Sequence, residues 1–215
     1  MAGSFGVGII GTGTHFSVSG SETEGGTGND GEGSTADEDE NFFYGSLFAE
    51  YSFGETHGIT LGVSYTPMET SLQTRSRTDV QTTSESNDGN ITSDDSGTYT
   101  ANARVSDHAT IYLEPTLMYD NFGVYLKGGL ARVTVTSLES IALGEDSSSY
   151  GNETVNGYLF GAGITNRFDN GMFYKFEVVR TMYDTIRLKS SSGNKNLITA
   201  DPDQVAGRLA IGWRF

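Results

Sequence analysis

Seven charged side chains occupy alternate positions of strand-like segments, on the faces opposite rows of apolar residues. They are Glu50, Glu114, Lys127, Lys175, Glu177, Arg208 and Arg214. If these strands close into a barrel, the seven side chains share a narrow lumen, because an eight-stranded barrel is just wide enough for side chains to fill it. Two roles are open: a salt-bridged plug that satisfies buried charges, or a narrow ion path. We expect the plug.

An acid-rich segment is the second candidate site. Residues 20–41 carry eight carboxylates and no basic residue, and are also rich in Gly, Ser and Thr. This composition predicts a solvated loop. The alternative is divalent-cation binding, since calcium takes oxygen ligands; the weak candidate ligands are Asp30, Glu32, Asp37 and Asp39. Their spacing does not match the calcium-binding EF-hand, so we expect no built metal site.

A third candidate is the pair His15 and Ser17, which resembles the H-x-S pair of an outer-membrane lipid A deacylase. Nucleophilic catalysis needs a base within hydrogen-bond reach of the serine and an acid that orients the base. The pair lies at a different place in the chain from that enzyme's pair, and the sequence assigns no third partner. We therefore expect no enzymatic activity and no cofactor.

Eight segments with a period of two would position these residues. They are residues 3–19, 42–53, a segment from 59 to 66, 99–119, 122–136, 154–168, 172–188 and 205–215. Such alternation is typical of strands with one apolar and one polar face. In the first segment the apolar parity shifts from Ile9 to Phe16 and Val18, which predicts a β-bulge near Gly11–Gly13.

The connections alternate between short and long. Short ones, at residues 54–58, 120–121 and 169–171, contain the Gly, Asn and Asp typical of hairpin turns. Long ones span residues 20–41, 75–98, 138–153 and 189–202. Every short turn therefore falls at one end of the sheet, as in outer-membrane barrels with short periplasmic turns and long extracellular loops.

The last segment indicates which face of the strands contacts lipid and which faces the lumen. Leu209, Ile211, Trp213 and Phe215 lie on one face, with Arg208 and Arg214 on the other. A membrane barrel has apolar residues outside and aromatic rings at the interface, whereas a soluble barrel such as a lipocalin has the opposite polarity. Aromatic residues near the short turns favour the membrane barrel.

Composition narrows the class further. The formal net charge of −15 argues against nucleic-acid binding, which needs a basic face. The chain has no cysteine, and no apolar run approaches the ~18 residues of a membrane helix. We expect one domain over residues 1–215, without a signal peptide.

Two stretches carry a resemblance to a known family. These are residues 207–215, G-R-L-A-I-G-W-R-F, and the paired segments Y-L-E-P-T-L and G-V-Y-L-K-G-G around residues 112–129. They resemble the small eight-stranded outer-membrane barrels of Gram-negative bacteria, of the OmpA, OmpX and OmpW type.

The resemblance implies an all-β, antiparallel up-and-down transmembrane barrel in the bacterial outer membrane. It implies that Leu209, Ile211, Trp213 and Phe215 form an assembly signal for the outer-membrane insertion machinery. The expected function is a non-enzymatic surface barrel that presents acidic extracellular loops; the alternative is a porin-like channel for small solutes or ions. Expected partners are the lipid bilayer and lipopolysaccharide, with divalent cations at the acidic loop.

Overall fold

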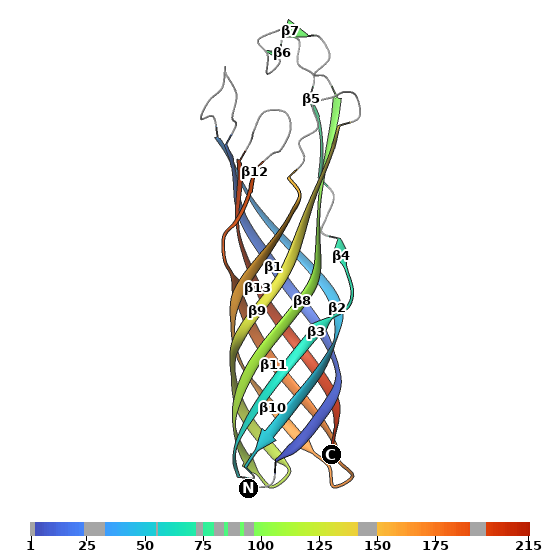
Figure 1. Ribbon diagram of the computed structural model, residues 1–215, viewed down its shortest axis with the longest axis vertical. Coiled ribbons are helices and arrows are strands. Elements are labelled where there is room, and N and C mark those ends of the chain that lie inside the picture. Colours follow the sequence, from blue (N-terminus) through green and yellow to red (C-terminus); the bar gives the residue numbers. More distant parts are fainter. Residues whose placement is uncertain are drawn as a thin grey trace.

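The chain forms one long barrel in a computed structural model, with its long strands running obliquely along its length (Figure 1). The structure describes residues 3–23, 33–54, 56–71, 75–79, 84–85, 91–92, 97–141, 150–189 and 197–215. Among these residues no helix is long and apolar enough to cross a membrane.

Eight antiparallel strands close the ring in the order β1-β2-β3-β8-β9-β10-β11-β13, and β13 pairs again with β1. Their bounds are β1 Ser4–Thr23, β2 Gly33–Phe53, β3 His57–Thr66, β8 Gly97–Tyr119, β9 Phe122–Ile141, β10 Asn152–Arg167, β11 Met172–Tyr183 and β13 Leu197–Arg214. Short strands extend the wall or lie apart from it: β4 Thr70–Ser71, β5 Arg75–Asp79, β6 Ser84–Glu85, β7 Ile91–Thr92 and β12 Ile186–Lys189. The predicted eight-stranded, all-β antiparallel barrel is confirmed.

The three predicted hairpin turns lie together at one end of the barrel, with both chain termini (Figure 1). Each contains a residue in the left-handed region of backbone space: Gly54 at φ 81°, Asp120 at φ 53° and Gly171 at φ 89°. Glycine adopts this region without strain, and aspartate tolerates it better than most residues. The turn chemistry in the sequence therefore located this end of the barrel correctly.

An apolar belt surrounds the half of the barrel nearest these turns. It consists of the outward side chains of residues 5–13, 43–53, 59–65, 111–119, 122–130, 158–168, 174–182 and 205–215. Most of these spans match the ~9–11 residues that a tilted strand needs to cross a bilayer. Since large exposed apolar surfaces on soluble monomers are rare, the belt makes this a membrane-spanning barrel.

The strands continue well beyond the belt, into segments that the sequence analysis assigned to long loops. β1 and β2 stay paired as far as Thr23 and Gly33, and β8 and β9 as far as Tyr99 and Ile141. The predicted loop bounds were therefore wrong. Acidic and small polar residues have low strand propensity. The alternation in the sequence therefore becomes weak in these segments, although the strands remain hydrogen-bonded to each other.

The predicted bulge near Gly11–Gly13 is also wrong. β1 keeps an unbroken register with β2 and β13 from Gly6 to Thr23. The register shift in the described ladders lies instead between Ser106 and Ala109, where Asp107 has φ 53°. The parity of the apolar residues in β1 changes because the barrel itself changes polarity.

Above the belt the lumen becomes apolar and the outer face polar. Val133, Val135, Val155, Ile186 and Leu188 form a buried inward cluster there. Outward positions on the same strands are taken by residues such as Arg132, Thr134 and Asn156. Below, inside the belt, the lumen contains the charged residues. The structure is thus two stacked halves of one barrel with opposite polarity.

Candidate functional site: a charge ladder beneath an apolar cavity

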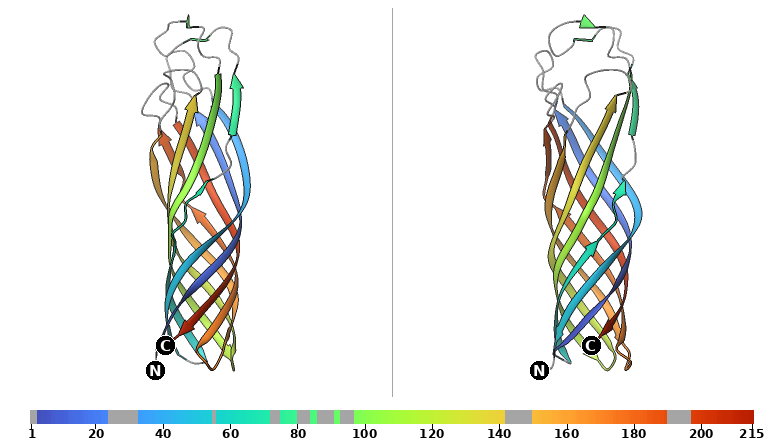
Figure 2. Two further views of the ribbon diagram at one scale, coloured as in Figure 1. Left: turned by 90° about the vertical axis from the view of Figure 1, so that its right-hand side faces the viewer. Right: turned by 45° about the vertical axis from the view of Figure 1, so that its right-hand side comes forward.

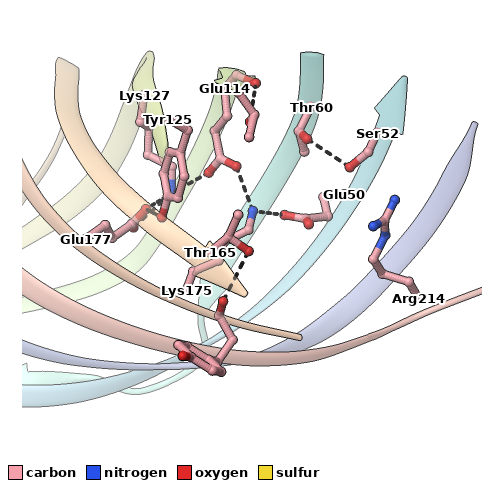
Figure 3. Close-up of polar contacts among 12 residues, drawn as sticks. Glu50, Ser52, Thr60, Glu114, Tyr125, Lys127, Thr165, Lys175, Glu177 and Arg214 are labelled. Carbon is pink, nitrogen blue, oxygen red and sulfur yellow. Dashed lines mark hydrogen bonds and ion pairs between the residues drawn. The ribbon is translucent and has the colours of Figure 1, made fainter. Parts of the chain in front are cut away.

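Six inward side chains form a chain of alternating charge across the lumen inside the belt, and Figure 3 labels all of them except Arg208. We call it the charge ladder; its order is Glu50, Lys175, Glu114, Lys127, Glu177 and Arg208. Lys175 Nζ lies 2.5 Å from Glu50 Oε2 and 2.6 Å from Glu114 Oε2. The three carboxylates and three cations sum to zero charge, which limits the cost of burying them.

The second half of the ladder starts at the other oxygen of the same carboxylate. Lys127 Nζ lies 3.0 Å from Glu114 Oε1 and 2.6 Å from Glu177 Oε2. Arg208 Nη1 follows at 3.6 Å from Glu177 Oε1. Glu114 is therefore the bridge between the two lysines, and its side chain is only 1% exposed.

The six residues of the ladder come from five different strands, whose inward side chains meet at one level of the lumen. Glu50 lies on β2, Glu114 on β8, Lys127 on β9, Lys175 and Glu177 on β11, and Arg208 on β13. Register brings two of them directly opposite, since Glu177 pairs with Arg208. The contact of Glu114 with Lys127 joins the neighbouring strands β8 and β9. The remaining three contacts cross the lumen between strands that are not neighbours, so they require the closed barrel.

Two tyrosines that the sequence analysis did not select complete the ladder. Tyr125 Oη donates a hydrogen bond to Glu177 Oε2 at 2.9 Å, and Lys127 Nζ lies 4.1 Å above the ring centroid of Tyr112. Each ring lies over a glycine of the neighbouring strand, Gly163 for Tyr125 and Gly62 for Tyr112. A glycine directly opposite an inward aromatic residue was the available signal, because a ring can cover a glycine across a strand pair.

Arg214, the seventh predicted member, stands apart from the ladder. Its guanidinium donates hydrogen bonds to Ser4 Oγ near the turn end of the barrel, and Figure 3 shows it to one side of the other charges, with no dashed contact to them. Within the described chain, Arg208 Nε is a buried nitrogen without a hydrogen-bond partner. Pairs of hydrogen-bonded hydroxyl groups lie on the lumen wall between Arg214 and the ladder; in one of them Ser52 Oγ lies 2.8 Å from Thr60 Oγ1.

A neutral layer lies above the ladder and forms the floor of the apolar half. Tyr183 Oη lies 3.2 Å from His108 Nε2 and donates to Gln204 Oε1 at 3.2 Å, while Gln204 Nε2 donates to Tyr44 Oη at 3.0 Å. Burial, aided by the positive charge of Arg208, lowers the pKa of His108 to about 4. His108 is therefore neutral at physiological pH, and this layer adds no charge to the lumen.

The residues predicted as an assembly signal all face outward at the turn end. Leu209, Ile211, Trp213 and Phe215 occupy alternate positions at the end of the chain and are exposed on the outer wall. Trp213 and Phe215 lie at the edge of the belt, as expected for interface aromatics. Their recognition by an insertion machinery stays a prediction.

The predicted metal candidates do not form a described site. Asp30 and Glu32 lie outside the described residues, and Asp37 and Asp39 are exposed on β2 rather than in a loop. No group of three or more potential metal ligands occurs in the described part of the chain.

The pair His15 and Ser17 faces outward on β1, just above the belt. His15 Nδ1 lies 3.0 Å from Asn41 Oδ1, and Nε2 lies 3.9 Å from Asp39 Oδ1. No hydrogen bond joins His15 to Ser17, both of which the structure describes, so the contact between base and nucleophile that catalysis requires is not formed.

Comparison with solved structures returns small barrels from bacterial surfaces. Two structures of Ail, the attachment invasion locus protein of Yersinia pestis, match with 13% and 11% identity, TM-scores of 0.39 and 0.41, and coverage of 97% of this chain and 99% of theirs. Neisserial surface protein A matches with 8% identity and a TM-score of 0.31, over 91% of this chain and 95% of that one.

No protein-family model matches the sequence, and no curated protein matches it. A closed antiparallel barrel with an apolar outer belt, and with short turns at one end, is the architecture of bacterial outer-membrane proteins.

Proposed function

We propose that this chain is a non-enzymatic surface protein of the bacterial outer membrane, built as a sealed barrel that carries an acidic, strand-built extension outside the bilayer. The observation that carries the proposal is the double closure of the lumen. The charge ladder fills the half inside the belt, and the apolar cluster of Val133, Val135 and Val155 gives the half above it an apolar lining.

Each closure opposes ion passage for a different physical reason. In the ladder every charge already has a partner of opposite sign, so a passing ion would have to break buried ion pairs. In the upper half the lumen has an apolar wall, and hydrophobic constrictions block ions by excluding water. A porin-like channel, the alternative function, would need both closures to open.

The surface role is supported by the extension above the belt. Its outer face is polar, with Asp37 and Asp39 on β2 and Asp201 and Asp203 on β13. Paired strands hold these carboxylates at defined positions, which suits presentation to a partner better than a loop does. We propose lipopolysaccharide and divalent cations as partners at this level, and the insertion machinery as partner of the last strand.

Planar-bilayer recording tests the sealed barrel. We expect no steady unitary conductance from the wild-type protein. A steady conductance that changes on Glu114→Gln or Lys127→Met would overturn the sealed-barrel proposal in favour of the channel. Glu69→Gln, outside the lumen in an exposed pair with Arg104, is the matched control and should change nothing.

A further inference from the structure

Two arginines at the turn end of the lumen lie outside the charge ladder. Arg167 ends β10 and Arg214 ends β13, and both are half-buried at inward positions. The C-terminus, one residue after Arg214, lies at the same end as the hairpin turns in both views of Figure 2. Only β11 separates β10 from β13, so the two strand backbones lie about 10 Å apart. The two long side chains therefore enter one mouth of the lumen.

Hairpin turns fix the backbone of both arginines. The Arg167 N–H donates to the carbonyl oxygen of Asn121 at 2.9 Å, and the Arg214 N–H donates to that of Gly171 at 2.8 Å. Each arginine is thus tied to a turn as well as to its own strand pairing. A ligand that contacts both side chains would not have to order this backbone first, which lowers the entropic cost of binding.

The two guanidinium groups have no carboxylate partner of their own. Arg214 Nε donates to Ser4 Oγ at 3.0 Å, and a neutral hydroxyl cancels no charge. Within the described part of the chain, no hydrogen bond or ion pair involves the Arg167 guanidinium. The positive charges of Arg167 and Arg214 also repel each other. The mouth of the lumen therefore holds two cations that their immediate neighbours do not neutralise.

The charge ladder attracts this pair without neutralising it. The carboxylates of Glu50 and Glu114 attract Arg167 across the lumen, but each of them already contacts Lys175, at 2.5 Å and 2.6 Å. Because the ladder sums to zero charge, it has no negative charge to spare. The membrane half of the described lumen therefore carries two positive charges in excess.

The surroundings of the two arginines add no anion. Between the ladder and the turns, none of the inward residues that the structure describes is acidic. Those on the wall include Ser52, Thr116, Gly123, Thr165 and Phe173. The turn carboxylates Asp120 and Asp169 are exposed, and no ion pair between described residues joins either of them to the two arginines. A negative group that neutralises the mouth would therefore come from outside the described chain.

The chemistry of the mouth selects a doubly charged oxyanion. A guanidinium presents N–H donors in a planar fork that fits the oxygens of a carboxylate or a phosphate. A carboxylate would neutralise one of the two charges, whereas a phosphate monoester carries about 1.5–2 negative charges at neutral pH. The Ser4 hydroxyl accepts from Arg214 and can donate its own hydrogen to a phosphate oxygen.

From these observations we propose that Arg167 and Arg214 bind a doubly charged phosphate group at the mouth of the lumen. The end with the short turns faces the periplasm in this architecture, and the barrel wall separates both inward side chains from lipid. The ligand is therefore the phosphate group of a periplasmic solute. Since the ladder fills the lumen beyond the mouth, the phosphate binds without crossing the membrane. The site does not depend on the surface role of the strand-built extension.

Phosphorus NMR of inorganic phosphate tests the proposal, with the protein folded in uncharged, phosphate-free detergent micelles at about pH 8, where phosphate is doubly charged. We expect the wild-type protein to broaden the phosphate signal in a saturable way. Arg167→Gln and Arg214→Gln should each weaken the affinity roughly tenfold, because each removes a charge-assisted hydrogen bond. The double variant should abolish the broadening.

The matched control is Arg132→Gln, the same change at an exposed arginine on the outer face of β9. It should leave the affinity unchanged. Sulfate, another doubly charged oxyanion, should displace phosphate, whereas chloride at the same ionic strength should not. The shift of the folded band on unheated gels verifies that each variant is folded.

A second competition identifies the source of the phosphate group. Glycerol phosphate, a soluble monoester, should displace inorganic phosphate, whereas phosphatidic acid in the micelle should not, because the barrel wall keeps it from the mouth. Displacement by phosphatidic acid alone would overturn the periplasmic solute as ligand. Equal broadening by the wild-type protein and the double variant would show that the arginine pair binds no phosphate. A loss in Arg132→Gln as large as in Arg167→Gln, or displacement by chloride as effective as by sulfate, would also overturn the site.

Discussion

Glu114 is the residue whose loss tests the charge ladder most sharply. Its two carboxylate oxygens contact two different lysines, at 3.0 Å and 2.6 Å, and its side chain is almost fully buried. Glu114→Gln keeps the shape of the side chain and removes only the charge, so no cavity term enters. Lys127 and Lys175 would each lose one of two carboxylate partners.

The size of the effect follows from how much compensation remains. Removing one partner of a buried ion pair costs about 3–5 kcal/mol when the other charge is left alone. Lys175 retains Glu50 and Lys127 retains Glu177, so we expect a loss near the lower end, about 3 kcal/mol. Glu69→Gln breaks an exposed ion pair with Arg104 and should cost less than about 1 kcal/mol.

Urea unfolding in lipid vesicles measures both variants. The chain has one tryptophan, Trp213, on the lipid-facing wall, so its fluorescence reports insertion and unfolding. A difference between Glu114→Gln and Glu69→Gln of about 2 kcal/mol or more is expected. Equal free energies of unfolding in the two variants would refute the reasoning that the ladder is a dry, interdependent network.

Three further predictions use the same unfolding assay. Gly163→Ala should lower the free energy of unfolding by about 1–3 kcal/mol, because the new Cβ would lie 2.5 Å from the Tyr125 ring. In Gly128→Ala no atom lies within 4 Å of the new Cβ, so the free energy of unfolding should not change. Equal losses in the two variants would contradict this packing. Leu126→Arg, inside the belt, should lower the free energy of unfolding by about 2–4 kcal/mol, whereas Thr134→Arg, above the belt, should change it by close to zero. The reversed order would show that the bilayer does not surround the belt. Since the pKa of His108 is lowered to about 4, unfolding should bind a proton below pH ~6.5, and stability should fall as the pH drops from about 6.5 to 4. His108→Gln should remove up to about 3 kcal/mol of that fall, and an unchanged pH profile would count against it.

Much of the membrane half could be predicted from sequence because its alternation is strict. In β11, Tyr174, Phe176 and Val178 face out while Lys175 and Glu177 face in, as expected. Turn chemistry located the hairpins, since residues such as Gly54 and Gly171 are suited to positive φ. Which charges meet could not be predicted, because contacts such as Lys175 with Glu50 depend on the stagger of strands that are not neighbours.

The upper half escaped prediction for a different reason. A period of two shows that a strand has two faces, but not which face is inside. Phe16 and Val18 follow the inward parity of β1, so the shift from Ile9 marked a change in the medium outside the barrel, not a bulge. Alternation alone leaves the membrane barrel and the lipocalin-like barrel as alternatives for the whole chain, yet each polarity holds for one half of this barrel.

Cysteine scanning along β9 tests the central claim, the reversal of polarity between the two halves, most directly. The chain has no cysteine of its own, so single cysteines from Phe122 to Thr136 report their surroundings through an attached fluorophore. We expect quenching by lipid-soluble agents at Val124, Leu126 and Leu130, quenching by water-soluble agents at Arg132 and Thr134, and protection from water-soluble agents at Val133. Quenching of Val133 by water-soluble agents to the same extent as Thr134 would show a wet upper lumen and contradict the account.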